Sequence, residues 1–134
     1  MNEYINPPTL VAPAGDAYSQ VTTTTAKKTI YVAGQVSWDK GGNVIGPGDL
    51  YTQAAQSLEN VRLGLEGAGA RKEDIVRIRY YVVNYTPECI PALMQAISEF
   101  FGESPTPASS LIGVSALMYP ELMIEIDTIA ATGE

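Results

Sequence analysis

The residues from Met123 to Ile129 constrain the fold of this chain most, because apolar and polar side chains alternate along them. Ile124 and Ile126 fall on one side of the stretch, and Glu125 and Asp127 fall on the other. A period of two residues is typical of a β-strand with one buried face. The sequence therefore predicts a strand here, with a carboxylate in the middle of an otherwise apolar segment.

A second strand is predicted just upstream, starting at the Pro-Ala-Ser-Ser stretch of residues 107–110. Proline fits the start of a strand because its ring fixes φ and removes a hydrogen-bond donor. A turn at 118–121 joins the two strands. Because an unpartnered buried carboxylate is costly, we expect hydrogen-bond donors or a ligand near Glu125.

The rest of the chain predicts an α+β fold with a single mixed sheet and two helices packed on one of its faces. Asp49 is a plausible N-cap for the first helix, and Gly67 and Gly69 can end it. The second helix is expected to start near Thr86, with Pro91 in its first turn. The remaining strands are expected at 21–25, 29–37 and 75–85, within one domain covering residues 1–134. Residues 1–13 are expected to form an extended lead-in.

The strand at 75–85 has two different faces. One carries Val76, Ile78, Tyr80 and Val82, which we expect under the helices; the other carries the set Arg77, Arg79, Tyr81 and Val83. Because helices on one side leave the other side of a sheet open, and because Tyr and Arg are common in subunit contacts, we expect this second face to contact other subunits. A solvated face is the alternative.

Charge and composition exclude several classes of function. The chain has 134 residues and a net charge of −7, which argues against a nucleic-acid partner. It has no histidine and one cysteine, Cys89, which excludes His-dependent triads and makes a metal site implausible. No glycine-rich phosphate loop is present, and we expect no cofactor. No apolar run is long enough to span a membrane, and no secretory signal is evident, so we expect a cytoplasmic protein.

Several motifs resemble the RidA (YjgF-type) family of small trimeric proteins. The family has a Pro-Ala-Arg-Ser stretch and then a strand close to Ile-Glu-Ile-Glu-Ala-Ile-Ala. It also has an apolar strand ending in Ser-Gly-Gln and a Gly-Pro-Tyr-x-Gln stretch near the N-terminus. The matching segments here are 107–110, 124–130, 30–36 and, with one inserted residue, 14–20.

The resemblance implies a chorismate-mutase-like subunit that assembles as a barrel-cored homotrimer, with small-molecule clefts between subunits. It also implies imine or enamine deaminase chemistry. Glu125 matches the family residue that positions or activates a water molecule. The positions matching the ligand-binding residues of the family are Tyr18, Ala33, Gly34, Ser109 and Ser110.

Two of these positions differ from the family pattern. The Arg that clamps the substrate carboxylate in active relatives is Ser109 here, and the Ser of Ser-Gly-Gln is Ala33. A guanidinium is a fixed charge with a bidentate fork, whereas a serine offers a single hydroxyl. Loss of the clamp is expected to cost roughly 2–4 kcal/mol of carboxylate affinity. Arg77 or Arg79 of a neighbouring subunit is a weak candidate for a replacement cation.

Each candidate residue also has a structural interpretation. Glu125 could bond to backbone donors or to an arginine, Tyr18 could anchor the N-terminal strand, and Gly34 could serve a bulge. Ser109 and Ser110 could be strand-start hydroxyls that contact backbone or water.

Three functions remain open: an imine or enamine hydrolase of altered or reduced activity, a metabolite-binding or sensor module, and a chaperone-like interaction protein.

Overall fold

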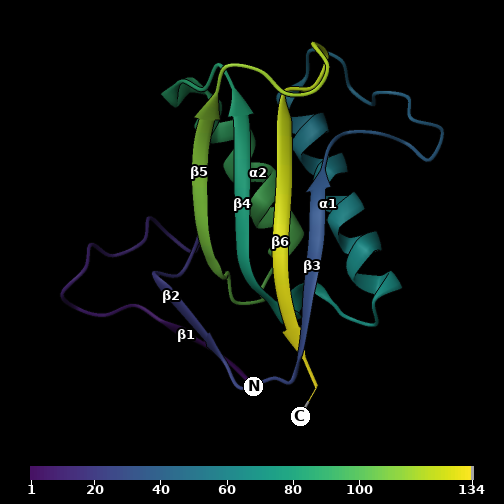
Figure 1. Cartoon of the computed structure of the whole chain (residues 1–134). Helices are drawn as coiled ribbons and strands as arrows, with labels where there is room; N and C mark the ends of the chain where they lie inside the picture. The colour runs from purple at the N-terminus through teal and green to yellow at the C-terminus, as the bar shows by residue number, and fades with distance from the viewer. Residues whose placement is uncertain (134) are drawn as a thin grey trace.

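The computed structural model describes residues 1–133 and shows a sheet of four strands with two helices packed against one face (Figure 1). The helices and strands are β1 (Asn2–Ile5), β2 (Val21–Thr24), β3 (Lys28–Gln35), α1 (Leu50–Gly67), β4 (Ile75–Val83), α2 (Ile90–Phe101), β5 (Ala108–Val114) and β6 (Ile124–Thr132). Short 3₁₀ turns at Lys72–Asp74 and Pro87–Cys89 precede β4 and α2. The α+β class and the two helices on one face are as predicted.

The main sheet is mixed and has the strand order β3-β6-β4-β5. β6 lies between β3 and β4 and is antiparallel to both, whereas β4 and β5 are parallel and α2 connects them. The strand bearing Glu125 is therefore a central strand, and the strand bearing Ser109 is an edge strand. No local pattern in the sequence specifies this order.

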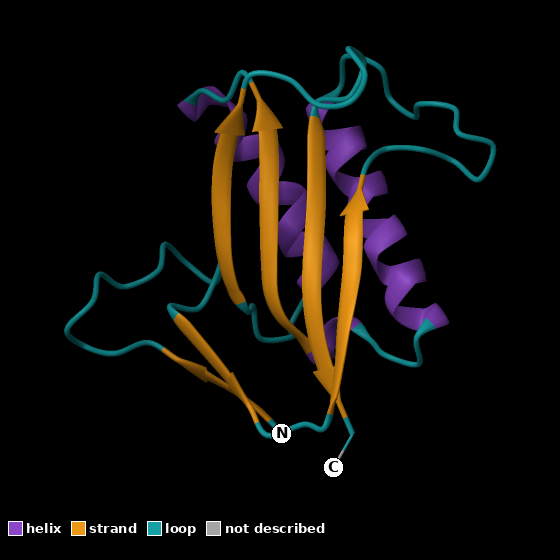
Figure 2. Ribbon diagram, in the orientation of Figure 1, coloured by secondary structure: helices purple, strands orange, loops and turns teal. Residues whose placement is uncertain are grey.

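The predicted alternation is confirmed along β6 and along β4 from Ile78 onward. The placement of Val76 under the helices was wrong, because a register shift between Ile75 and Arg77 puts Ile75 in the core and leaves Val76 half-buried. Ile78, Tyr80 and Val82 of β4 are buried beneath the helices, as are Ile124 and Ile126 of β6. The two helices contribute to the same core, mainly through the residues Ala54, Leu58, Val61, Leu65, Leu93, Ala96, Ile97 and Phe101. The opposite face of the sheet, which we call the open face, has no helix over it (Figure 2).

The ends of α1 follow the predicted capping chemistry. The Asp49 carboxylate accepts a hydrogen bond of 3.1 Å from the backbone N–H of Thr52, which identifies Asp49 as the N-cap. Beyond the C-terminus of the helix, Gly69 has a φ of +79°, and its N–H bonds to the carbonyl of Glu66. Glycine adopts this left-handed conformation without steric penalty.

The N-terminal segment differs from the predicted lead-in. β1 pairs antiparallel with β2, from Asn2 opposite Thr24 to Ile5 opposite Val21, in a separate two-stranded sheet. The predicted single sheet therefore accounts for only four of the strands (Figure 2). Four residues are too few to show a clear strand pattern in the sequence. The pairing that makes β1 a strand is with β2, about twenty residues further along the chain, and no local pattern indicates it.

Within residues 1–133, no helix is both long enough and apolar enough to cross a bilayer.

Candidate functional site

A β-bulge near the end of β3 shapes the surroundings of Glu125. Val32 pairs with Thr128 and Gln35 pairs with Ile126, so Ala33 and Gly34 together oppose a single residue of β6. A bulge of this kind bends the strand and frees backbone groups from regular pairing. Of the two interpretations of Gly34 from the sequence, the bulge is therefore present.

The side chain of Glu125 packs directly against Gly34. A Cβ added to Gly34 would lie 2.6 Å from Cδ of Glu125 and 2.9 Å from its Cγ, both too close for real atoms. Glu125 itself is half-buried. The missing side chain at position 34 thus provides the space in which the carboxylate lies.

The neighbouring carboxylate, Asp127, has its partners on the open face. Nε of Arg79 donates a hydrogen bond of 2.9 Å to Asp127, and the Tyr81 hydroxyl donates one of 3.2 Å. The hydrogen bond to Asp127 and the negative charge of that carboxylate hold the pKa of Arg79 above its usual value. The pKa of Tyr81 is raised mainly by burial and next by the negative charge of Asp127. Asp127 therefore has a structural role.

Glu125 contrasts with Asp127 in this respect. Tyr81 lies opposite Glu125 in the strand register, yet its hydroxyl bonds to Asp127. Among residues 1–133, Arg79 and Tyr81 direct their side-chain donors to Asp127, which leaves Glu125 outside this network. A half-buried carboxylate outside such a network is free to bond to a water molecule or a ligand.

The two serines at the start of β5 lie on opposite faces of the sheet. In the parallel register Ser109 is beside Ile78 and Ser110 is beside Arg79. Because Ile78 points into the core, Ser109 points towards the helix side, whereas Ser110 lies on the open face. There its hydroxyl accepts a hydrogen bond of 3.4 Å from Arg77.

The pairing of β4 with β5 also shows where Arg77 and Arg79, the candidate replacements for the clamp arginine, lie. Arg77 and Arg79 are on the open face, so within one chain neither guanidinium lies on the side of the sheet that Ser109 faces. Arg79 is also neutralised by its salt bridge to Asp127 at 2.9 Å.

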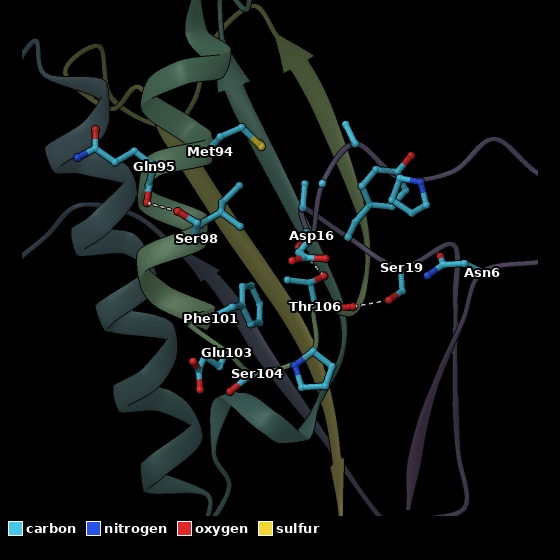
Figure 3. Close-up of a pocket in the computed structure, with 18 residues that line it drawn as sticks. Asn6, Asp16, Ser19, Met94, Gln95, Ser98, Phe101, Glu103, Ser104 and Thr106 are labelled. Carbon is cyan, nitrogen blue, oxygen red and sulfur yellow. Dashed lines mark hydrogen bonds between the residues drawn. The ribbon is translucent and has the colours of Figure 1, made fainter.

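Tyr18 lies in a different region, where the segment before β2 packs against the end of α2. It lines a groove of about 940 Å3 together with residues 13–19, the C-terminal half of α2 and residues 102–106 (Figure 3). Ser19 forms an isolated bridge with Ala108, the first residue of β5. Tyr18 is therefore near the strand that carries Ser109, but Glu125 is not among the residues lining the groove.

The predicted site residues thus fall into two groups within one chain. Ala33, Gly34 and Glu125 lie together where β3 ends and β6 begins. The set Tyr18, Ser109 and Ser110 lies at the beginning of β5. Glu125 aligns across β4 with Ile112, three residues further along β5 than Ser109. A single copy of the chain therefore does not bring the two groups together.

Within residues 1–133, no cluster of His, Cys, Asp and Glu side chains could hold a metal ion. The chemistry available near Gly34 is that of a carboxylate beside backbone that lies outside the regular ladder, where the carbonyl of Ala33 accepts a hydrogen bond of 3.2 Å from the side chain of Gln35.

Some features of this region were missed from the sequence. The contact between Gly34 and Glu125 joins residues that are about ninety positions apart, and no local pattern indicates it. The groove was also missed, although its walls include Thr106 and Ser19, which flank segments that were recognised. The ion pair between Arg79 and Asp127 could have been predicted. The sequence places Arg79 and Asp127 on the strand faces that point away from the core, and the two side chains have opposite charges.

A family model described as Endoribonuclease L-PSP matches residues 9–132 of the chain. A 2-iminobutanoate/2-iminopropanoate deaminase from Dermatophagoides farinae is 31% identical over 101 residues, which is 75% of this chain and 76% of the relative. The chain belongs to the RidA family. The resemblance noted from the sequence is thereby confirmed.

Solved structures of RidA-type proteins have the same fold. A Rid-family protein of unknown function from Yersinia pestis, YyfB, superposes with a TM-score of 0.93 at 37% identity, covering 98% of each chain. A crystal structure of TdcF from E. coli with bound serine has a TM-score of 0.69 at 24% identity, covering 92% of this chain and 91% of that one. At that identity the second likeness supports the fold alone.

Proposed function

We propose that this RidA-family chain hydrolyses a small imine or enamine that lacks a carboxylate beside the reacting carbon. The observation that carries the proposal is the placement of Glu125. Its carboxylate is half-buried, packs against the Cβ-free surface of Gly34 and lies outside the Arg79 network. The similarity to an imine deaminase gives the reaction class.

In the proposed reaction, Glu125 accepts a proton from a water molecule whose oxygen forms a bond to the imine carbon. The imine nitrogen takes up protons and leaves as ammonia, and the carbon becomes a carbonyl. Water and imine are thus converted into a carbonyl compound and ammonia, with no change of oxidation state. The bulged backbone at Ala33 and Gly34 would orient the substrate, because it lies outside the regular ladder and carries no side chain at Gly34.

We further propose that the complete site forms between copies of the chain in a homotrimer. The Tyr18 and Ser109 group of one copy would face the Gly34 and Glu125 group of the next. The separation of the two groups within one chain supports this arrangement, because neither group alone offers both a base and a substrate pocket.

The substrate class follows from Ser109. A serine hydroxyl is neutral, and the register places the cations Arg77 and Arg79 on the opposite face of the sheet. A carboxylate at this position would lose solvation without gaining a charged partner. A neutral imine, or one bearing hydroxyl groups, avoids that cost.

A metabolite-binding module is the second candidate, and the same neutral position favours it. If Ser109 binds a hydroxyl or carbonyl group of a ligand, the cleft can hold a metabolite without converting it. RNA is not an expected ligand despite the description of the family model, because the chain has a net charge of −7.

An experiment with two sources of imine distinguishes the hydrolase from the metabolite-binding module. An amine oxidase acting on benzylamine supplies a carboxylate-free imine, and an amino-acid oxidase supplies a 2-imino acid. Release of ammonia is followed in the presence and absence of the chain, with Glu125→Gln as the matched variant. We expect faster release from the carboxylate-free imine and no acceleration with Glu125→Gln.

Two results would count against the proposal. Acceleration of neither imine would reject the hydrolase and leave the binding module, to be pursued by a thermal-shift screen of metabolites. Faster turnover of the 2-imino acid than of the neutral imine would show that the substrate class assigned from Ser109 is wrong.

A further inference from the structure

The groove beside Tyr18 has the dimensions of a small-molecule site. Its volume is about 940 Å3, at the upper end of the roughly 300–1,000 Å3 usual for ligand pockets. One wall is the segment 13–19, and the other is the C-terminal half of α2 with the following residues 102–106. The proposed hydrolytic centre at Glu125 makes no contribution to it.

An apolar surface lies along the α2 side of the groove. Figure 3 shows the side chains of Met94 and Phe101 directed from α2 towards the opposite wall, while the side chain of Gln95 points away. Phe101 is buried, and Met94 is half-buried. A flexible thioether and an aromatic ring suit the apolar part of an organic ligand.

The opposite wall is fixed in place by hydrogen bonds. The Ser19 hydroxyl donates to the carbonyl of Thr106 at 2.6 Å, and the Thr106 hydroxyl donates to the carbonyl of Asp16 at 2.8 Å (Figure 3). Ser19 and Thr106 are both buried. Because both walls are held before any ligand binds, binding would not require the segment to be ordered first.

The charges around the groove have one sign. The carboxylates of Asp16 and Glu103 belong to its lining and are exposed, and within residues 1–133 no lysine or arginine lines it. The chain as a whole carries a net charge of −7. An anion entering the groove would be repelled, whereas a cation would be attracted. The half-buried aromatic ring of Tyr18 also favours a nearby cation.

We propose that this groove binds a small organic cation, namely an ammonium group attached to an apolar body. The apolar body lies against Met94 and the adjoining part of α2, and the carboxylates of Asp16 and Glu103 around the groove attract the ammonium group. The inference goes beyond the proposed hydrolysis. Tyr18 belongs both to the groove and to the proposed trimer cleft, but Glu125 does not line the groove, so binding of the cation does not require the hydrolytic step.

The test uses the full chain and three probes of similar shape. Phenethylammonium is the cation, 2-phenylethanol its neutral counterpart and phenylacetate the anion, and binding is measured by calorimetry or by ligand-observed NMR. We expect saturable binding of phenethylammonium, weaker binding of the alcohol and no binding of the anion. Equal binding of all three probes, or no saturable binding of the cation, would overturn the proposal.

Three variants locate the binding. Ser98→Trp fills the groove from an exposed position of α2 and should abolish binding. Asp16→Asn combined with Glu103→Gln should weaken binding about threefold to tenfold, because two partly screened charges are lost. Glu3→Gln removes a charge from exposed β1, outside the groove, and should leave the affinity unchanged.

Unaltered binding in Ser98→Trp would place the cation elsewhere and overturn the assignment. Glu125→Gln separates this inference from the proposed function, since it should abolish hydrolysis and leave phenethylammonium binding intact. Thermal unfolding of each variant establishes that it is folded before affinities are compared.

Discussion

The carboxylate of Glu125 occupies the space that a side chain at Gly34 would need. An added Cβ would lie 2.6 Å from Cδ of Glu125, and the φ angle of Gly34 is outside the left-handed region. The requirement for glycine at position 34 is therefore set by the neighbouring carboxylate and not by backbone strain.

This relationship predicts the effect of Gly34→Ala. The new methyl group should displace the Glu125 side chain and lower the free energy of unfolding by roughly 1–3 kcal/mol, as overpacking usually does. Chemical denaturation measures the change. In a Glu125→Ala background the same substitution should cost almost nothing, so the double-mutant cycle should show strong coupling.

A matched control for this prediction lies at the end of α1. A Cβ added to Gly67 would meet no atom within 4 Å, and its φ is also outside the left-handed region. Gly67→Ala should be neutral or stabilise the fold by up to about 1 kcal/mol. A loss of stability in Gly67→Ala equal to that in Gly34→Ala would show that the contact with Glu125 is not the cause.

Restoring an arginine at position 109 should change the substrate preference. A guanidinium there would bind the carboxylate of 2-imino acids and raise kcat/KM for them by about 30-fold to 1,000-fold, equivalent to roughly 2–4 kcal/mol. Steady-state ammonia release with the amino-acid oxidase as the imine source measures this. Ser110→Arg is the control, because the register places Ser110 on the opposite face of the sheet.

If Ser110→Arg improves turnover of 2-imino acids as much as Ser109→Arg does, the substrate is not held specifically at position 109, contrary to our proposal. If neither variant changes turnover while the neutral imine is still hydrolysed, position 109 does not contact the substrate.

The buried hydroxyl of Tyr80 predicts a pH dependence of stability. This group finds no hydrogen-bond partner among residues 1–133, and burial raises its pKa well above 10. In the unfolded chain a tyrosine ionises near pH 10, whereas the folded chain keeps Tyr80 protonated. Its contribution to stability is complete below pH 10 and declines above it, with a slope of up to about 1.4 kcal/mol per pH unit.

Tyr80→Phe should make the loss of stability above pH 10 less steep, by up to the slope that corresponds to one proton. At neutral pH the substitution should be neutral or slightly stabilising, since it removes an unsatisfied buried group. Denaturant melts at several pH values between 8 and 11 measure both effects. Tyr119→Phe is the control, because Tyr119 is 52% exposed and lies outside the proposed interface. An equal decline in wild type and Tyr80→Phe would contradict the prediction.

The open face predicts association of the chain into a trimer. Tyr31 of β3 is 76% exposed and pairs with Ile129 of β6, in a region with no helix above it. Tyr31→Glu should cost little in an isolated chain but should weaken a trimer by burying a charge in the interface. Light scattering as a function of concentration measures the mass. A wild-type chain that remains monomeric at high concentration would refute the trimer.

A second variant tests whether the position of the added glutamate matters in the trimer experiment. Leu63 lies on α1, on the other side of the molecule, and is 49% exposed. Leu63→Glu adds the same charge to the helix surface and should leave the mass unchanged. If Leu63→Glu dissociates the trimer and Tyr31→Glu does not, the interface is on the helices and not on the sheet.

Local patterns in the sequence predicted the features that depend on local chemistry. The alternation around Ile124 and Ile126 identified the buried face of β6, and Asp49 was identified as the cap of α1. The family motifs identified the fold and positions such as Gly34. In each case the relevant interactions lie within a few residues of one another or follow from a resemblance to a known fold.

The features that were missed depend on contacts between distant segments. The pairing of β1 with β2 and the parallel pairing of β4 with β5 set which residues are neighbours across the sheet. The faces of Ser109 and Ser110, and hence the separation of Ser109 from Glu125, follow from that pairing. Strand order is a property of the whole sheet, so single-strand periodicity could not predict it.

The bulge in β3 makes the geometry of the sheet edge depend on chain length. Deleting Ala33 would let β3 and β6 pair one residue to one, with Gly34 opposite Asp127 and Gln35 still opposite Ile126. The bend that the extra residue introduces would be lost, and with it the present approach of Gly34 to Glu125. One extra residue in β3, together with the absence of a side chain at Gly34, therefore sets where the carboxylate of Glu125 lies.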